Sequence, residues 1–84
     1  MLFKILYTKL AYKDIKKLDS VTKKRLKKRI EKSLPTPLFN ARELTDPRIG
    51  TYRWRVGNYQ VIFDIEGKTI VVLRVRHRKE SYKR

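Results

Sequence analysis

Residues 51–75, TYRWRVGNYQVIFDIEGKTIVVLRV, carry the strongest structural pattern in the 84-residue sequence. Polar and apolar side chains alternate through most of this stretch, which is typical of β-strands with one buried face. Gly57-Asn58 suits the two-residue turn of a β-hairpin, and Glu66-Gly67 indicates a second turn. We therefore predict three antiparallel strands in series, over residues 52–56, 59–65 and 69–75.

The beginning of the chain predicts one more strand and a short helix. Residues 2–7 alternate, which places Phe3, Ile5 and Tyr7 on one face of a strand. Thr8 is a favourable N-cap for the helix that follows. The apolar side chains of this helix recur at near-helical spacing, at Leu10, Ala11, Ile15 and Leu18.

A second helix, strongly basic, is predicted from Ser20 to about Leu34. Asp19 and Ser20 supply a break and a new N-cap. Pro35 and Pro37 end the helix, because proline cannot donate the backbone hydrogen bond that a helix needs. The apolar side chains recur at every fourth position, at Leu26, Ile30 and Leu34. We interpret residues 36–49 as a connection with at most one short turn of structure.

These elements define one α+β domain spanning residues 1–84. A chain of this length cannot build two cores, because each half would be too small to fold without disulfides or metal. The expected order is β-α-α-β-β-β. It predicts a compact fold with two N-terminal helices packed on one face of a four-stranded, mostly antiparallel sheet.

Positive charge dominates the composition. Lys and Arg number 23 against 8 Asp and Glu, a net charge of +15, which favours a polyanionic partner such as nucleic acid. The chain has no cysteine and one histidine, which excludes a disulfide framework, a thiolate nucleophile and a histidine-based metal site. No stretch is apolar enough for a membrane span, and the start of the chain does not fit a signal peptide. We therefore expect a cytoplasmic protein with no membrane partner and no metal or other cofactor.

Alternation along the first strand of the hairpin separates aromatic from basic side chains. Tyr52 and Trp54 point to one face, which we interpret as the core, and Arg53 and Arg55 to the other. Across the expected turn Arg55 faces Gln60, so two strands share the polar face. Such a face can bind phosphate, but arginines alternating on the wet face of a sheet are also an ordinary solvated surface.

Two other basic segments are candidate phosphate contacts. The second helix has seven Lys and Arg against one Glu, and its candidate RNA contacts are Lys23, Lys24, Lys27 and Lys28. The C-terminal segment combines cations, an imidazole and a phenol at His77, Arg78, Lys79 and Tyr82. The alternatives are a solvated helix face and a frayed basic tail. Asp46, Glu66 and Lys68 loosely resemble the acids and lysine of metal-dependent nucleases, but turn chemistry explains these positions.

The run from Thr51 to Val75, followed by HRKESY at residues 77–82, resembles the RelE branch of the RelE/ParE toxin superfamily. The order of strand, two helices and hairpin-rich sheet agrees over essentially the whole chain, and the C-terminal third is the specific part. The resemblance implies the toxin of a type II toxin–antitoxin system. It further implies a ribosome-dependent endoribonuclease that cleaves messenger RNA in the A site and so inhibits translation.

The resemblance also implies roles for individual residues. The catalytic residues would be Arg53, Arg55, Arg78 and Tyr82, and Gln60, His77, Lys79 and the helix lysines would contact RNA. The 2′-hydroxyl of the RNA would attack the adjacent phosphorus without a metal ion, and the arginines would stabilise the phosphorane. Tyr82 or His77 would take the proton; the residues do not decide between them.

Two positions depart from the family pattern. Gln60 stands where arginine is frequent, and Arg76 stands where glycine is common. Gln60 can donate a hydrogen bond but carries no fixed charge, so we expect weaker cleavage than in family members with arginine there.

The resemblance implies partners as well. We expect a cognate acidic, RelB-like antitoxin that forms a hetero-oligomer with the toxin, and the ribosome and messenger RNA as targets. Two other functions fit the same fold. One is a ParE-like inhibitor of DNA gyrase, which needs a contact surface and no catalytic residues, and the other is a non-catalytic RNA-binding module.

Overall fold

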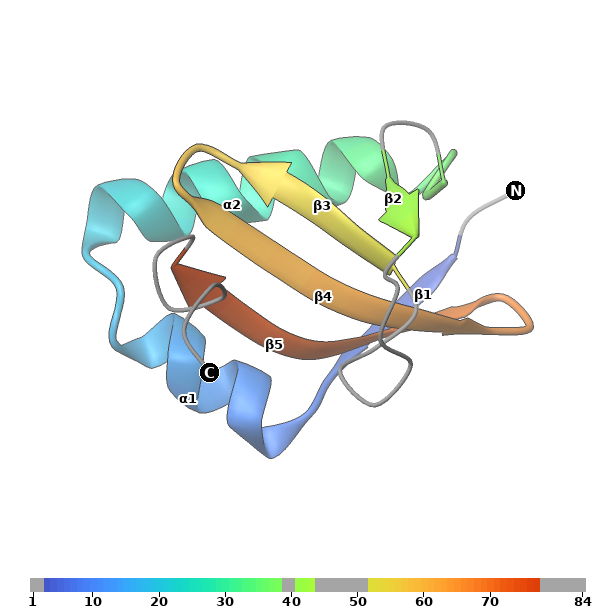
Figure 1. The fold of residues 1–84 in the computed structure, drawn as a ribbon, viewed down its shortest axis with the longest axis horizontal. Helices are drawn as coiled ribbons and strands as arrows, with labels where there is room; N and C mark the ends of the chain where they lie inside the picture. The colour runs from blue at the N-terminus through green and yellow to red at the C-terminus, as the bar shows by residue number, and fades with distance from the viewer. Residues whose placement is uncertain (1–2, 39–40, 44–51, 78–84) are drawn as a thin grey trace.

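The computed structural model describes residues 3–38, 41–43 and 52–77 of the chain. Figure 1 shows helices packed against a twisted sheet. In chain order the elements are β1 (Lys4–Tyr7), α1 (Lys9–Lys16), α2 (Ser20–Ser33), β2 (Arg42–Glu43), β3 (Tyr52–Val56), β4 (Tyr59–Glu66) and β5 (Thr69–His77).

The strands form one sheet in the order β1-β5-β4-β3-β2. β1 pairs with β5 in parallel, and the other neighbours are antiparallel. The predicted α+β class and mostly antiparallel sheet are therefore confirmed. The predicted strand number is wrong, because within the described ranges the sheet has five strands rather than four. Arg42–Glu43 pairs with β3 inside the segment that we interpreted as a connection, and two residues are too few to show a period.

The two hairpin turns follow from glycine. Gly57 and Gly67 both have φ of +59°, a left-handed conformation that glycine adopts at little cost. The first turn and its pairing of Arg55 with Gln60 are as predicted. The second turn lies one residue later than expected, because Glu66 still pairs with Thr69 as the last residue of β4.

Both helices cover one face of the sheet, and the core lies between these two layers. Figure 1 shows α2 running behind β3 and β4, and α1 beside β5. Trp54 and Phe63 are fully buried and stack with ring centroids 4.0 Å apart, which confirms that Trp54 is a core residue. The other core residues are Ala11, Leu26, Ile30, Val61, Ile70, Val72 and Val75. No helix in the described part of the chain is long and apolar enough to cross a membrane.

Two apolar residues lie outside the core that their spacing predicted. Leu10 is 54% exposed, because the buried stripe of α1 runs through Ala11 and Ile15 instead. Tyr7 is 44% exposed although Ile5 on the same strand packs against the core. Burial of part of its ring, and secondly the nearby charge of Glu31, raise the pKa of the Tyr7 phenol.

Helix α1 completes the edge of β5 beyond the end of β1. β1 pairs with β5 only as far as Val72. The Thr8 hydroxyl then donates to the Leu73 carbonyl at 2.8 Å and, as the predicted N-cap of α1, accepts from the Ala11 N–H at 3.1 Å. Further along this edge, the Val75 N–H donates to the Asp14 carboxylate at 3.0 Å. Backbone groups at this edge therefore have side-chain partners.

A β-bulge interrupts the pairing of β4 with β5. Ile62 pairs with Arg74, whereas the next residue, Phe63, pairs with Val72. Leu73 is therefore an extra residue on β5. Beyond the bulge, odd-numbered residues of β5 face the core and even-numbered residues face away from the helices.

Candidate nucleic-acid interface

The sheet face opposite the helices carries two cross-strand rows in which all side chains but that of Ile62 are polar. One row comprises Arg55, Gln60 and Arg76, and the next comprises Arg42, Arg53, Ile62 and Arg74. Directly opposed residues in antiparallel strands share a face and lie about 5 Å apart at Cβ. We call Arg42, Arg53, Arg55, Gln60, Arg74 and Arg76 the arginine face.

Gln60 is the buried centre of this face. It is 3% exposed, and its side-chain oxygen accepts a hydrogen bond from Nη1 of Arg53. Hydrogen bonds to a charged group contribute about 1.5–3 kcal/mol. Gln60 was predicted as an RNA contact; in this structure its oxygen holds the guanidinium of Arg53, while Arg55 is exposed.

Arg74 is already paired within the protein. Its Nε and Nη2 donate to the two carboxylate oxygens of Asp14 at 2.8 and 3.1 Å. Burial raises the pKa of Asp14, but the hydrogen bonds from Arg74 and the Val75 N–H, together with the charges of Arg74 and Arg76, lower it below its usual value. Asp14 therefore stays ionised and neutralises Arg74, which leaves Arg53, Arg55 and Arg76 as the cations at the centre of the face.

Arg74 and Arg76 were not among the predicted site residues. If side chains alternated regularly after the buried Val72, Arg74 and Arg76 would both point into the core. The bulge at Leu73 shifts the alternation by one residue and places them on the arginine face. The sequence does contain a signal. The apolar Val75 stands between two arginines and three positions after the apolar Val72, and an odd spacing between core residues of one strand requires an extra residue between them.

His77 lies on the other side of the sheet. It pairs with Tyr59, and the two rings meet edge to face with centroids 5.1 Å apart. Tyr59 pairs with Val56, whose side chain faces the helices, whereas Arg53 and Arg55 point away from them. The imidazole is thus not brought together with these arginines.

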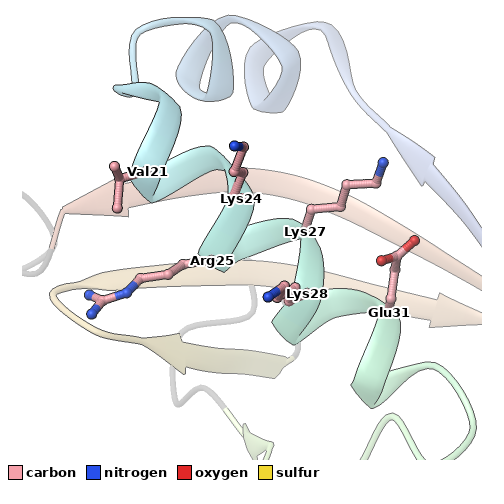
Figure 2. Close-up of a pocket in the computed structure, with 6 residues that line it drawn as sticks. All are labelled: Val21, Lys24, Arg25, Lys27, Lys28 and Glu31. Atoms are coloured by element: carbon pink, nitrogen blue, oxygen red, sulfur yellow. The ribbon is translucent and has the colours of Figure 1, made fainter.

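The lysines of α2 form a second basic surface on the helix side of the molecule. Lys23, Lys24, Lys27 and Lys28 are all exposed. Figure 2 shows the side chains that line a hollow along the outer side of α2, with Lys27 and Glu31 on the flank toward β1. It measures about 420 Å³ and is lined by Val21, Lys24, Arg25, Lys27, Lys28 and Glu31. The fold therefore places these lysines and the arginine face on opposite sides of the sheet.

Several predicted residues lie outside the described part of the chain. These are Arg78, Lys79 and Tyr82 in the tail, and Asp46 in the connection between β2 and β3. Glu66 and Lys68 lie at the turn between β4 and β5, as their sequence context indicated. The described residues contain no group of three His, Cys, Asp or Glu that could hold a metal ion.

Comparisons with known proteins agree with this arrangement. A family model described as the ParE toxin of the type II toxin–antitoxin system parDE matches residues 5–82. Toxin RelE3 of Methanocaldococcus jannaschii is 36% identical over 83 residues, which cover 94% of both chains.

Two solved toxin–antitoxin complexes share the fold. The first is RelBE2 of Mycobacterium tuberculosis, with a TM-score of 0.82 and 26% identity over 93% of this chain and all of the matched chain. The second is RelB–RelE of Methanococcus jannaschii, with a TM-score of 0.73 and 32% identity over 93% of this chain and 95% of the matched chain. The chain therefore belongs to the ParE toxin family of type II toxin–antitoxin systems, within the RelE/ParE superfamily.

Proposed function

We propose that this toxin is a ribosome-dependent endoribonuclease of the cytoplasm that cleaves messenger RNA in the A site. The observation that carries the proposal is the arginine face. Arg53 and Arg55 project from one strand, and the buried Gln60 holds the guanidinium of Arg53. Planar guanidinium groups arranged in this way match the geometry of phosphate oxygens.

The chemistry that fits these residues is an attack by the RNA on itself. The 2′-oxygen forms a bond to the adjacent phosphorus and the bond from phosphorus to the 5′-oxygen breaks, which leaves a 2′,3′-cyclic phosphate and a 5′-hydroxyl. Arg53, Arg55 and Arg78 would stabilise the extra negative charge of the phosphorane. Tyr82, as its phenolate, would accept the 2′-proton, and water would supply the proton that the leaving 5′-oxygen takes up. DNA lacks the attacking hydroxyl, so the reaction is confined to RNA.

We also propose an acidic, RelB-like antitoxin as the regulatory partner, in a hetero-oligomer with the toxin. The matched structures from Mycobacterium tuberculosis and Methanococcus jannaschii are toxin–antitoxin complexes. A net charge of +15 favours a partner with carboxylates over the basic surfaces. Its association rate constant should fall steeply as salt is raised, and a rate independent of salt would contradict the electrostatic part of this proposal.

Mapping of transcript ends on programmed ribosomes tests the nuclease activity. The expected products carry a 2′,3′-cyclic phosphate and a 5′-hydroxyl at A-site codons. Arg53→Met should lower the cleavage rate about 100-fold, the usual effect of removing one group that stabilises a developing anion. Lys68→Met is the matched control, because it removes the same charge at the distant turn between β4 and β5. Intact transcripts, or equal rates for the two variants, would contradict the proposal.

A gyrase inhibitor is the second candidate, and Gln60 is the observation that favours it. At the buried centre of the face this chain has an amide without charge, which a binding surface tolerates better than a phosphoryl-transfer site. A supercoiling assay separates the candidates, because a gyrase inhibitor would block supercoiling and leave messenger RNA intact. A harmless protein that binds RNA without cutting it would instead be the non-catalytic RNA-binding module.

A further inference from the structure

Arg76 carries a buried hydrogen-bond donor without a partner. Its Nε is shielded from solvent, and no acceptor lies within reach in the described part of the chain. A buried donor left unpaired costs about 1–3 kcal/mol, so proteins rarely leave one without a reason. This donor lies on the arginine face beside the buried Gln60, its direct cross-strand neighbour, and not among the core residues.

The nearby acceptors are occupied by other groups. The side-chain oxygen of Gln60 accepts from Arg53. Both carboxylate oxygens of Asp14 accept from Arg74, and one of them also accepts the Val75 N–H. The charge of Arg76 helps to lower the pKa of Asp14, but no hydrogen bond joins the two side chains. Within the described residues, the charge of Arg76 on the arginine face is therefore not neutralised by a hydrogen-bonded carboxylate.

We propose that Arg76 is a phosphate-binding residue of the RNA site. This inference rests on the proposed function and extends its RNA contacts from β3 across β4 to β5. Neighbouring strands lie about 4.8 Å apart, so Arg55 and Arg76 flank Gln60 at a separation of about 10 Å. A chain of successive phosphates can meet both cations. Because the Nε of Arg76 is shielded from solvent, the two terminal Nη groups form the fork that binds two oxygens of one phosphate.

Equilibrium binding of a short fluorescein-labelled single-stranded RNA, measured by anisotropy over a salt series, tests this assignment. Each phosphate contact to a single strand contributes about 0.7 to the slope of log K against log salt. Arg76→Met should reduce the slope by about that amount and weaken binding at low salt about fivefold. Lys68→Met is the charge-matched control, about 25 Å away along β5, and should retain most of the wild-type slope. Equal slopes and affinities for the two variants would overturn the inference.

Two further measurements separate binding from a structural role. Arg76→Lys keeps the charge but loses the planar fork of the guanidinium, so it should recover the slope and only part of the affinity; recovery of neither would contradict a phosphate contact. Removal of an unpaired buried donor should leave the thermal midpoint of Arg76→Met equal to or above that of the wild type. A lower midpoint with unchanged RNA binding would show that Arg76 supports the fold instead. Cleavage on ribosomes is scored separately, so wild-type protein that binds RNA through Arg76 without cutting it contradicts the nuclease proposal alone.

Discussion

Replacing Asp14 by Asn should destabilise the protein by an amount that depends on pH. The Asp14 side chain is 14% exposed and that of Arg74 is 32% exposed, so the pair lies between a surface and a buried ion pair. Exposed pairs contribute 0–1 kcal/mol, and breaking a fully buried pair costs 3–5 kcal/mol. With two hydrogen bonds from Arg74 and one from the Val75 N–H, we expect a loss of about 2 kcal/mol at neutral pH.

The sign of the pH dependence follows from the lowered pKa. The carboxyl is more acidic in the folded than in the unfolded protein, so it stabilises the fold fully above its unfolded pKa of about 4. This contribution is lost as the pH falls through the lower, folded pKa. The wild type and Asp14→Asn should therefore differ most near neutral pH and converge below about pH 4.

Thermal unfolding followed by circular dichroism measures the effect. A domain of 84 residues has an unfolding entropy of about 0.18 kcal/mol per degree, so a loss of 2 kcal/mol lowers Tm by about 11 °C. A double-mutant cycle with Arg74→Met should give a coupling free energy of about 1–2 kcal/mol. A Tm difference that stays constant from pH 7 to pH 3, or a coupling energy near zero, would refute this account of the ion pair.

Three other substitutions test single contacts. Gln60→Leu removes the oxygen that accepts from Arg53 but removes no charge. RNA affinity should therefore fall while the slope of log K against log salt stays the same, and a changed slope would contradict this role of Gln60. Trp54→Phe loses the 2.8 Å hydrogen bond to the Pro37 carbonyl and should lower the free energy of unfolding in urea by about 2–3 kcal/mol. A change near zero would indicate that Trp54 is solvent-exposed. Gly67→Ala at φ +59° should cost about 1 kcal/mol in the same assay, and a neutral result would exclude strain at this turn.

The elements that were predictable from sequence are those whose period is long enough to show. The strands β3 to β5 and both helices each repeat their burial over several residues, and the turn at Gly57 follows from backbone chemistry. β2 has two residues and no period, so only its pairing with β3 reveals it. Leu10 shows a related limit. Helical spacing suggests an apolar stripe, but the helix packs through its neighbour Ala11, and that choice depends on how α1 meets the sheet.

Only part of the candidate site could be predicted from the sequence. Arg53 and Arg55 could be found because they alternate with aromatic residues on one strand. The role of Gln60 depends on which neighbour its oxygen accepts from, and that is a matter of three-dimensional geometry. Arg74 and Arg76 required knowledge of a bulge, which changes the face of every residue after it.

Magnitudes explain why β5 adopts the bulge. Without it, Arg74 and Arg76 would face the apolar core, and each buried charge costs several kcal/mol. Val75 would also leave the core, which forfeits about 1.5 kcal/mol or more of burial. The bulge itself disturbs one or two backbone hydrogen bonds of about 1 kcal/mol each, because Leu73 is left without a partner residue on β4. The bulged register is therefore favoured by several kcal/mol.

Helix α1 reduces the remaining cost of the bulge and so connects the two sides of the sheet. The Thr8 hydroxyl satisfies the Leu73 carbonyl, and Asp14 satisfies the Val75 N–H on the same edge. Asp14 also binds Arg74, the first side chain that the bulge turns toward the arginine face. Because Asp14 both completes the edge and fixes this arginine, a substitution at Asp14 should alter RNA binding even though α1 covers the opposite face of the sheet.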